Sequence, residues 1–222
     1  MVTQNQIMII LATYNRAPIL KRTLDAFCTL ECDNLNVEFV VIDNNSTDNT
    51  KQLIESFASK LPITYLFEPR PGKNCALNKA LTQLELAPII VFTDDDVIPD
   101  KNWLAVIASA CSQWPQYSIF GGRIYAIWPG GIVPNWAADK QILELGFACH
   151  DHGDSAKEYK AGSFPFGPNF WVRKKVFANG ILFDETIGPM PKGRTMGSET
   201  SLLKKISEDG LKMLYYPDAR VG

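Results

Sequence analysis

Three consecutive aspartates, Asp94, Asp95 and Asp96, directly follow a short apolar run at residues 89–92 and one threonine. The run, Ile-Ile-Val-Phe, is rich in β-branched residues, which is typical of a buried strand. The aspartates would then lie at the carboxyl end of that strand, where open α/β sheets bind their ligands. Three neighbouring carboxylates repel one another, and a divalent cation offsets that repulsion. Oxygen ligands of this kind suit Mg²⁺ or Mn²⁺, usually together with substrate phosphates.

The acidic stretch also has a simpler interpretation. It can be a turn that caps a helix beginning near Pro99, because aspartate is common in turns and at helix N-termini. That interpretation suffices for a single aspartate. Three in succession after an apolar strand favour a ligand site.

Alternation of strands and helices predicts the fold. Apolar runs at residues 7–12, 37–42 and 63–67 precede the run at 89–92, and segments with helical spacing of apolar residues follow each of the four. Four such alternations predict an α/β fold, a Rossmann-like, mostly parallel central sheet flanked by helices. With 222 residues, 46% of them hydrophobic, the chain suffices for one domain of this kind.

Composition excludes several classes of protein. The 22 basic and 24 acidic residues give a net charge of −2, and the basic residues are scattered, so we expect no nucleic-acid partner. No apolar run is long enough to span a bilayer, and the polar start is no signal peptide. Five cysteines without a Cys-x-x-Cys pair fit a reducing compartment. We predict a cytoplasmic protein, with a peripheral position at the inner face of the membrane as an alternative.

The second half of the chain is more irregular. We expect strands at residues 118–127 and 211–216, and a helix that opens near Glu199. We predict that residues 1–115 and residues 116–222 form two halves of the same domain. Because the sequence stops directly after a strand, we expect the natural protein to continue past its last residue.

Three polar loops follow the first three predicted strands, at residues 13–16, 43–45 and 70–74. In a parallel sheet these loops open at one edge, so they could line one pocket beside the aspartates. Asp43 could accept hydrogen bonds from a base or ribose, and Arg70 and Lys73 could meet phosphate charge. Neither a Gly-x-Gly-x-x-Gly motif nor a Walker A lysine motif occurs, which disfavours the common dinucleotide and P-loop sites.

These segments resemble the successive motifs of the family 2 glycosyltransferases. The matching text is Ala-Thr-Tyr-Asn-Arg at 12–16, Val-Ile-Asp-Asn-Asn-Ser-Thr-Asp at 41–48, Gly-Lys-Asn-Cys-Ala-Leu-Asn at 72–78 and Phe-Thr-Asp-Asp-Asp at 92–96. The resemblance covers essentially the whole chain and keeps the family's order. It implies that residues 1–115 are the nucleotide-sugar-binding half and residues 116–222 the acceptor-binding half of one domain. It implies the GT-A fold and an inverting transferase that takes a sugar from a nucleoside diphosphate sugar, usually a UDP-sugar, with a divalent metal.

The resemblance also implies roles for particular residues. Asp43 would contact the base, Asp94 would face the ribose, and Asp96 would bind the metal, while Asp95 fills the variable middle position of an Asp-x-Asp motif. The remaining residues expected around the nucleotide sugar are Thr13, Tyr14 and Arg16 beside the nucleotide, Arg70 and Lys73 near the base and diphosphate, and Asn169 in a Gly-x-Asn turn below the donor sugar.

The catalytic base of the family lies in a Glu-Asp pair at the start of a helix, after a glycine. Here the text is Gly-Ser-Glu-Thr at 197–200, so only Glu199 is a candidate base. Its simpler interpretation is an acidic residue in a first turn, which favours the helix dipole. A late histidine that often completes the metal site in the family would fall beyond the last residue, and metal binding would then be weaker.

We therefore expect a metal-dependent hexosyltransferase that acts on a glycan, lipid-linked or other hydroxyl acceptor in the synthesis of polysaccharide, lipopolysaccharide or another glycoconjugate. One alternative is a nucleotidylyltransferase, which would normally show a Gly-rich basic loop after the first strand. The other is a non-catalytic protein that binds nucleotide sugars. The sequence leaves open the donor sugar, the linkage and the oligomeric state.

Overall fold

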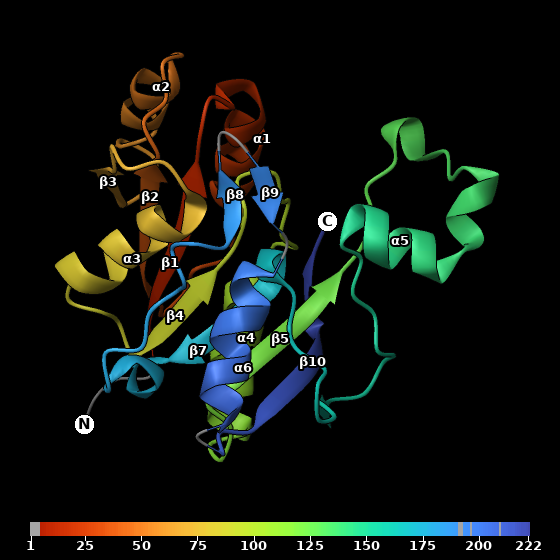
Figure 1. Ribbon diagram of the computed structural model, residues 1–222. Coiled ribbons are helices and arrows are strands. Elements are labelled where there is room, and N and C mark those ends of the chain that lie inside the picture. The colour runs from red at the N-terminus through yellow and green to blue at the C-terminus, as the bar shows by residue number, and fades with distance from the viewer. Residues whose placement is uncertain (1–4, 191–192, 196, 209) are drawn as a thin grey trace.

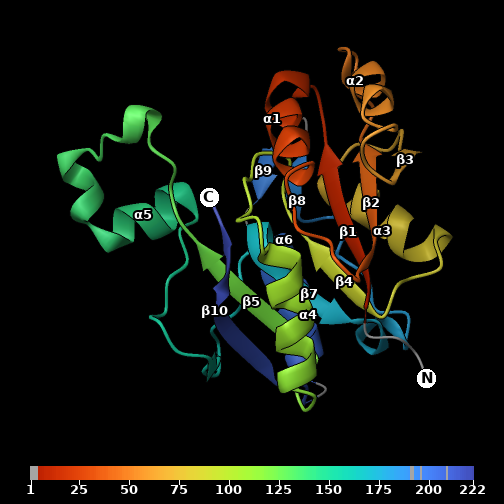
Figure 2. The same ribbon diagram turned by 180° about the vertical axis from the view of Figure 1, so that it is seen from behind.

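The computed structural model describes residues 5–190, 193–195, 197–208 and 210–222. Their main feature is an eight-stranded mixed sheet with helices on both faces (Figures 1 and 2). The strand order is β3-β2-β1-β4-β7-β5-β10-β6. The strands are β1 (Gln6–Thr13), β2 (Asn36–Asp43), β3 (Ile63–Phe67), β4 (Ile89–Phe92), β5 (Ile119–Ile124), β6 (Lys157–Glu158), β7 (Phe170–Arg173) and β10 (Met213–Val221). The predicted α/β fold with a mostly parallel sheet is confirmed.

Helices cover the two faces unequally. The α-helices are α1 (Ala17–Phe27), α2 (Thr50–Ser56), α3 (Lys73–Gln83), α4 (Trp103–Gln113), α5 (Lys140–Phe147) and α6 (Ser198–Glu208). Apolar residues of α1, α2 and α4 pack in one core cluster, and those of α3 and α6 pack in a second. Figure 1 shows α3 and α6 in front of the sheet. Figure 2, viewed from the opposite side, shows α1 and α4 in front of it. The sheet is therefore doubly wound.

Short elements complete the chain. A two-stranded antiparallel sheet consists of β8 (Gly188–Met190) and β9 (Gly193–Thr195). The 3₁₀ turns are η1 (Pro129–Gly131), η2 (Asn135–Ala138), η3 (Gly167–Asn169) and η4 (Lys174–Phe177).

Strand β1 shows why the central strands read as continuous apolar runs. Neighbouring residues point to opposite faces, so Ile9 lies in one core cluster and Ile10 in the other, each completely buried. A parallel strand covered on both faces needs apolar residues at every position. Helix α1 begins at Ala17 with a proline in its first turn, where the missing N–H costs no hydrogen bond.

Strand register sets the position of the acidic loop. β1 pairs in parallel with β2 on one side and β4 on the other, and Thr13 lies opposite Asp43. β4 stops at Phe92, which lies opposite Ile10, three residues short of Thr13. The chain after β4 therefore passes beside the last residues of β1. Helix α4 begins only at Trp103, so the aspartates do not cap it as the simpler interpretation expected.

The last strand is longer than predicted. We expected it to end before Pro217, but β10 runs from Met213 to Val221. Its pairing with β5 shifts between Tyr215 and Arg220, and such an irregularity accommodates a proline, which has no N–H to donate. β5 is conversely shorter than expected and ends at Ile124.

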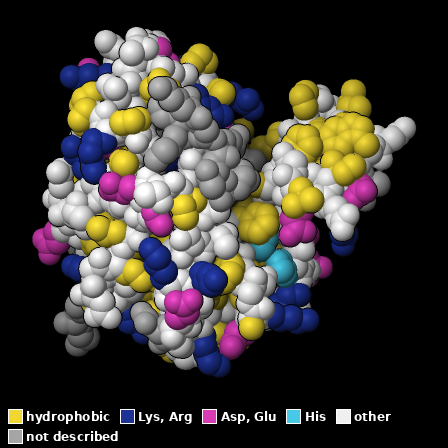
Figure 3. Space-filling view, in the orientation of Figure 1, with side chains coloured by type: hydrophobic (Ala, Val, Ile, Leu, Met, Phe, Trp, Pro, Cys, Tyr) yellow, Lys and Arg dark blue, Asp and Glu magenta, His cyan; other side chains and the backbone are white. Residues whose placement is uncertain are grey.

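A lobe at residues 127–148, which contains α5, projects from the rest of the molecule (Figures 1 and 2). Its Trp128, Trp136 and Phe147 rings cluster with centroids 5.3 to 5.4 Å apart. Ile132 and Leu145 are 76% and 83% exposed, and Figure 3 shows apolar side chains gathered over this lobe. Within the described chain, no helix is both long and apolar enough to cross a bilayer.

Candidate functional site

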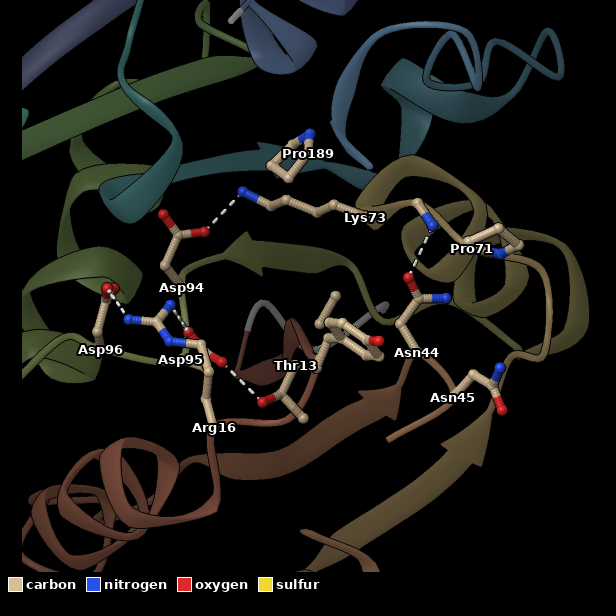
Figure 4. A pocket seen from close by; sticks show the side chains of 13 residues that line it. Thr13, Arg16, Asn44, Asn45, Pro71, Lys73, Asp94, Asp95, Asp96 and Pro189 are labelled. Atoms are coloured by element: carbon tan, nitrogen blue, oxygen red, sulfur yellow. Dashed lines mark hydrogen bonds and ion pairs between the residues drawn. The ribbon is translucent and has the colours of Figure 1, made fainter. Parts of the chain in front are cut away.

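A cavity of about 550 Å³ opens at the carboxyl ends of β1, β2 and β4 (Figure 4). This is the edge of an α/β sheet where ligands bind. The lining residues are Ala12, Thr13, Tyr14, Arg16, Asn44, Asn45, Pro71, Gly72, Lys73, Asp94, Asp95, Asp96 and Pro189. The three predicted polar loops and the three aspartates thus meet at one place.

Asp95 fixes the floor of the cavity. The residue is 4% exposed, and its Oδ2 accepts a 2.7 Å hydrogen bond from the Thr13 hydroxyl. Its Oδ1 accepts from Nη1 of Arg16 over 2.6 Å, and its carbonyl oxygen accepts from the Thr23 hydroxyl. Burial raises the pKa of Asp95 to about 6, although the bonds from Thr13 and Arg16 oppose that shift. Both carboxylate oxygens are therefore engaged by the protein itself.

Asp96 is the more accessible aspartate. Its side chain is 46% exposed, and Oδ2 accepts from Nη2 of Arg16 over 2.8 Å. The guanidinium thus bridges Asp95 and Asp96. Burial alone would lower the pKa of Arg16, but the hydrogen bond to Asp96 and the nearby carboxylates raise it. Arg16 is the permanent counter-charge of this side of the cavity.

Lys73 provides the counter-charge of the other side. Its Nζ donates to Oδ1 of Asp94 over 2.6 Å and to Oε1 of Glu199 over 2.7 Å. Burial would lower the pKa of this ammonium, but the attraction of Asp94 and Glu199 raises it instead. Lys73 is the first residue of α3, and Glu199 lies in the first turn of α6. The predicted base is therefore brought to the edge of the cavity through Lys73.

The turn at η3 makes room for Glu199. A β-carbon on Gly167 would lie 2.6 Å from Oε1 of Glu199, well inside van der Waals contact. A residue with a side chain at position 167 would displace the carboxylate. The glycine of the Gly-x-Asn turn thus serves the predicted base.

Asn44 shapes the rim of the cavity on the β2 side. Its Nδ2 donates to the carbonyl oxygens of Glu68 and Arg70, and its Oδ1 accepts from the N–H of Gly72 over 2.8 Å. Gly72 has φ of 123°, a conformation that favours glycine. The sharp turn at Gly72 aims the start of α3, and with it Lys73, at the aspartates.

Besides Glu199, three predicted residues do not line the cavity. Asp43 is 2% exposed and accepts hydrogen bonds from the Tyr65 hydroxyl and the Ser46 N–H. Burial and the neighbouring Asp43 raise the pKa of Tyr65 to about 12. Arg70 is held at the surface by ion pairs to Glu68 and Glu185. The roles of Asp43 and Arg70 at the base and diphosphate stay predictions.

Asn169 is the third of these residues and is completely buried. It accepts from Nε1 of Trp103 and donates to the carbonyl oxygens of Arg123 and Ala219. These bonds join α4, β5 and β10, so Asn169 holds the η3 turn in place from behind. It lies in the same turn as Gly167, and its predicted contact with the donor sugar stays a prediction.

Several lining residues had no predicted role. Asn44 and Asn45 belong to the motif at residues 41–48, and Pro71 and Gly72 directly precede Lys73. Their position in the predicted loops was the indication that they line the cavity. Pro189 comes from β8, far along the chain, and no local pattern connects it with the cavity. Tertiary packing alone brings it there.

The carboxylate oxygens at the cavity could hold a divalent cation if a bound ligand supplied the remaining oxygen atoms. Within the described part of the chain, no group of three or more His, Cys, Asp or Glu side chains could hold a metal. Asp96, by contrast, presents carboxylate oxygens to the cavity, and Mg²⁺ and Mn²⁺ are usually held by one or two carboxylates plus substrate phosphates. Cys149, His150, Asp151 and His152 are neighbours in the sequence and all potential metal ligands, but they do not form such a group in the structure.

Comparison with known proteins decides the family. The model of "Glycosyl transferase family 2" matches residues 8–180. The chain belongs to glycosyl transferase family 2. The predicted family is thereby confirmed, and the alternation of strands and helices described above is that of its GT-A fold.

Curated relatives of this family 2 chain have low sequence identity to it and are longer than it is. Validoxylamine A glucosyltransferase of Streptomyces hygroscopicus subsp. jinggangensis is 30% identical over 115 residues, 51% of this chain and 27% of the relative. Glycosyltransferase AglE of Haloferax volcanii is 23% identical over 214 residues, 96% of this chain and 64% of the relative. The match thus spans 27% of the first of these relatives and 64% of the second.

Solved structures share the fold. The mannosyltransferase PcManGT from Pyrobaculum calidifontis, in complex with GDP-Man and Mn²⁺, superposes with a TM-score of 0.66 and 21% identity, covering 97% of this chain and 55% of PcManGT. TarS of S. aureus in complex with UDP-GlcNAc gives a TM-score of 0.68 and 20% identity, covering 96% of this chain and 58% of the TarS chain.

Proposed function

We propose that this family 2 chain transfers a sugar from a nucleoside diphosphate sugar to an acceptor hydroxyl, with inversion at the anomeric carbon. A UDP-sugar is the expected donor. The observation that carries the proposal is the arrangement around Lys73, whose ammonium joins the acidic end of β4 to Glu199. In this proposal a donor-binding group and a candidate base would lie near the same reacting carbon.

The donor would lie in the cavity at the end of the sheet. Arg16 and Lys73 supply positive charge there for a diphosphate, and Tyr14, 47% exposed, offers a ring at the cavity wall for the nucleotide. Asp94 faces the same space and can accept hydrogen bonds from a ribose. Relatives of the fold that carry UDP-GlcNAc or GDP-Man support a nucleotide-sugar donor without choosing the base.

A divalent cation is expected with the donor. Asp96 is the residue that would hold it, and Mg²⁺ or Mn²⁺ would neutralise the charge that develops on the departing diphosphate. The solved relative with GDP-Man also contains Mn²⁺, which supports this cofactor class. Arg16 already binds one oxygen of Asp96 and orients the carboxylate toward the cavity.

The transfer would be a single displacement. The acceptor oxygen attacks the anomeric carbon from the face opposite the diphosphate, and the bond from that carbon to the phosphate oxygen breaks as the new glycosidic bond forms. The electron pair of the broken bond stays on the diphosphate. Glu199 takes the acceptor proton, and because Oε1 is engaged by Lys73, Oε2 is the oxygen that would accept it.

The acceptor is expected on the side of residues 116–222, which supply Glu199 and the η3 turn. Its chemical class is a glycan, lipid-linked or other hydroxyl compound, as in polysaccharide or other glycoconjugate synthesis. A cytoplasmic or peripheral membrane location would suit such a donor.

The alternative of a nucleotidylyltransferase loses support. The loop after β1 contains no glycine and is held by Arg16 and Thr13 bonds to Asp95, so it does not wrap a triphosphate as a Gly-rich loop would. A non-catalytic nucleotide-sugar-binding protein stays the rival that experiment must separate.

Release of nucleoside diphosphate from UDP-GlcNAc, UDP-glucose and GDP-mannose, each with and without Mn²⁺, tests the proposal. We expect Mn²⁺-dependent release with one donor class, faster with a suitable acceptor. A thermal-shift screen of UDP, GDP and CDP identifies the nucleobase of the donor, because a bound nucleotide stabilises the folded form. Binding without release in the presence of a broad acceptor panel would instead favour the non-catalytic rival.

A further inference from the structure

Lys73 is shared between the two functional halves of the site. Its Nζ lies 2.6 Å from Asp94, which follows β4, and 2.7 Å from Glu199 on α6. The side chains of Lys73 and Glu199 are each 18% exposed, so solvent screens this pair much less than a surface pair. One ammonium therefore serves two carboxylates that belong to different steps of the proposed reaction.

Charge around this lysine is unbalanced before any donor binds. One positive charge faces two negative charges, and the ammonium can donate three hydrogen bonds, of which Asp94 and Glu199 take two. Lys73 also lines the cavity proposed for the donor, so a diphosphate would enter within reach of the same ammonium. A phosphate oxygen forms a strong charge-assisted bond to an ammonium and would compete with both carboxylates.

An ion pair also restrains a carboxylate. While Oε1 of Glu199 accepts from Lys73 over 2.7 Å, the carboxylate is held in place, and only Oε2 is free to accept a hydrogen bond from an acceptor hydroxyl. A diphosphate that draws Lys73 away would free both oxygens. The lysine stem is flexible and its head is a compact point charge, so the ammonium can redistribute among three anionic partners.

We propose that Lys73 is a positioning residue that couples the donor cavity to Glu199, so that Glu199 is released from Lys73 when a donor diphosphate binds. This inference rests on the proposed function. The coupling must be reciprocal: if the diphosphate loosens Glu199 from Lys73, then Glu199 opposes binding of the diphosphate to the same degree. A binding measurement can therefore detect the coupling without any acceptor.

The test is a double-mutant cycle in nucleotide affinity, measured by titration calorimetry with UDP and Mn²⁺ and repeated with GDP. Glu199→Gln removes the competing charge and is expected to tighten nucleotide binding about 5- to 10-fold, the lower part of the usual range for coupled sites. Lys73→Met is expected to weaken binding. In the Lys73→Met background, Glu199→Gln is expected to change affinity less than 2-fold, because the shared cation is gone.

Controls separate the possible outcomes. Glu208→Gln removes an exposed acid from the same helix and should leave affinity unchanged. Lys73→Gln serves in place of Lys73→Met if that variant does not fold, and Lys73→Arg should restore part of the Glu199→Gln effect.

Each outcome has one meaning. Tightening that requires Lys73 supports the coupling. Unchanged or weaker binding in Glu199→Gln overturns it, and so does tightening that persists without Lys73, because that result would reflect direct repulsion between Glu199 and the nucleotide. Absence of binding of either nucleotide to the unmodified protein would instead contradict the proposed function.

Discussion

Arg16 donates from Nη1 to Oδ1 of Asp95 over 2.6 Å and so joins the loop after β1 to the loop after β4. The pair is asymmetric, because the Arg16 side chain is 40% exposed and that of Asp95 is 5% exposed. The buried Asp95 carboxylate depends on the more exposed Arg16 for its counter-charge. The middle aspartate of the acidic stretch is therefore a structural anchor of the cavity, while its neighbours Asp94 and Asp96 face the cavity more openly.

Arg16→Ala should cost stability for this reason. It leaves the buried Asp95 carboxylate with only the Thr13 hydroxyl, and we expect the free energy of unfolding to fall by about 1–3 kcal/mol. Adding Asp95→Asn should cost less than the sum of the single changes, with a coupling of about 1–2 kcal/mol. Urea denaturation measures all three variants, and Lys21→Ala, which breaks an exposed pair with Asp25, should stay within about 0.5 kcal/mol. Strict additivity would contradict the anchoring role.

Asp96→Ala should separate binding from folding. The side chain is 46% exposed and follows a strand rather than filling the core, so we expect an unchanged unfolding transition. Metal-dependent affinity for the nucleotide should fall by about 10-fold or more, because a carboxylate ligand of the cation is lost. Calorimetry with UDP and Mn²⁺ checks this, with Asp25→Asn on α1 as an exposed acidic control. Equal affinity of the variant and the unmodified protein would remove Asp96 as metal ligand.

The sequence predicts the cavity at the strand ends better than the surroundings of Glu199, for a physical reason. The strands before Thr13, Asp43 and Asp94 are apolar on both faces, so their ends could be located, and parallel strands bring those ends together. The pair of Lys73 with Glu199 spans 126 residues, and no local pattern could indicate it. Only packing of α6 beside α3 on one face of the sheet creates that contact.

Asn169 and the α5 lobe show two other limits of prediction. A Gly-x-Asn turn indicated a residue at the donor sugar, but the asparagine turns inward to Trp103 and to backbone carbonyl oxygens. No element was assigned to residues 142–159, and the structure forms the end of α5 there without burying any residue of that helix. An amphipathic pattern alone does not indicate what its apolar face packs against.

Gly167→Ala should reduce transfer more than binding. The new methyl group would lie 2.6 Å from Oε1 of Glu199, so the carboxylate must shift from the position it has beside Lys73. A misplacement of about 1 Å can cost about 100-fold in rate, so we expect a 10- to 100-fold lower turnover with nucleotide affinity changed less than 3-fold. Gly146→Ala is the matched control, because a β-carbon there meets nothing within 4 Å. Full turnover in Gly167→Ala would argue against Glu199 as the base.

His150 should make the fold sensitive to mild acid. Burial, with a further contribution from His152, lowers the pKa of His150 to about 3, and its Nε2 is hydrogen-bonded to the Tyr159 hydroxyl. In the unfolded chain a histidine titrates near 6.5, so below that pH the unfolded form takes up a proton that the folded form refuses. Stability contributed by neutral His150 is therefore lost as the pH falls from about 6.5 toward 3.

Between pH 7 and pH 5 this loss amounts to about 2 kcal/mol. His150→Gln should lose that much less stability than the unmodified protein over the same interval, whatever its stability at pH 7. Urea denaturation at the two pH values provides the comparison. Parallel losses in the two proteins would show that His150 is accessible to protons in the folded state.

The most direct measurement of the central claim is a crystal structure of the chain grown with UDP and Mn²⁺. The account predicts a nucleotide in the cavity at the ends of β1, β2 and β4, with the metal on Asp96 and the diphosphate within hydrogen-bonding reach of Lys73. A nucleotide bound elsewhere, or a cavity that stays empty at saturating UDP and Mn²⁺, would contradict it.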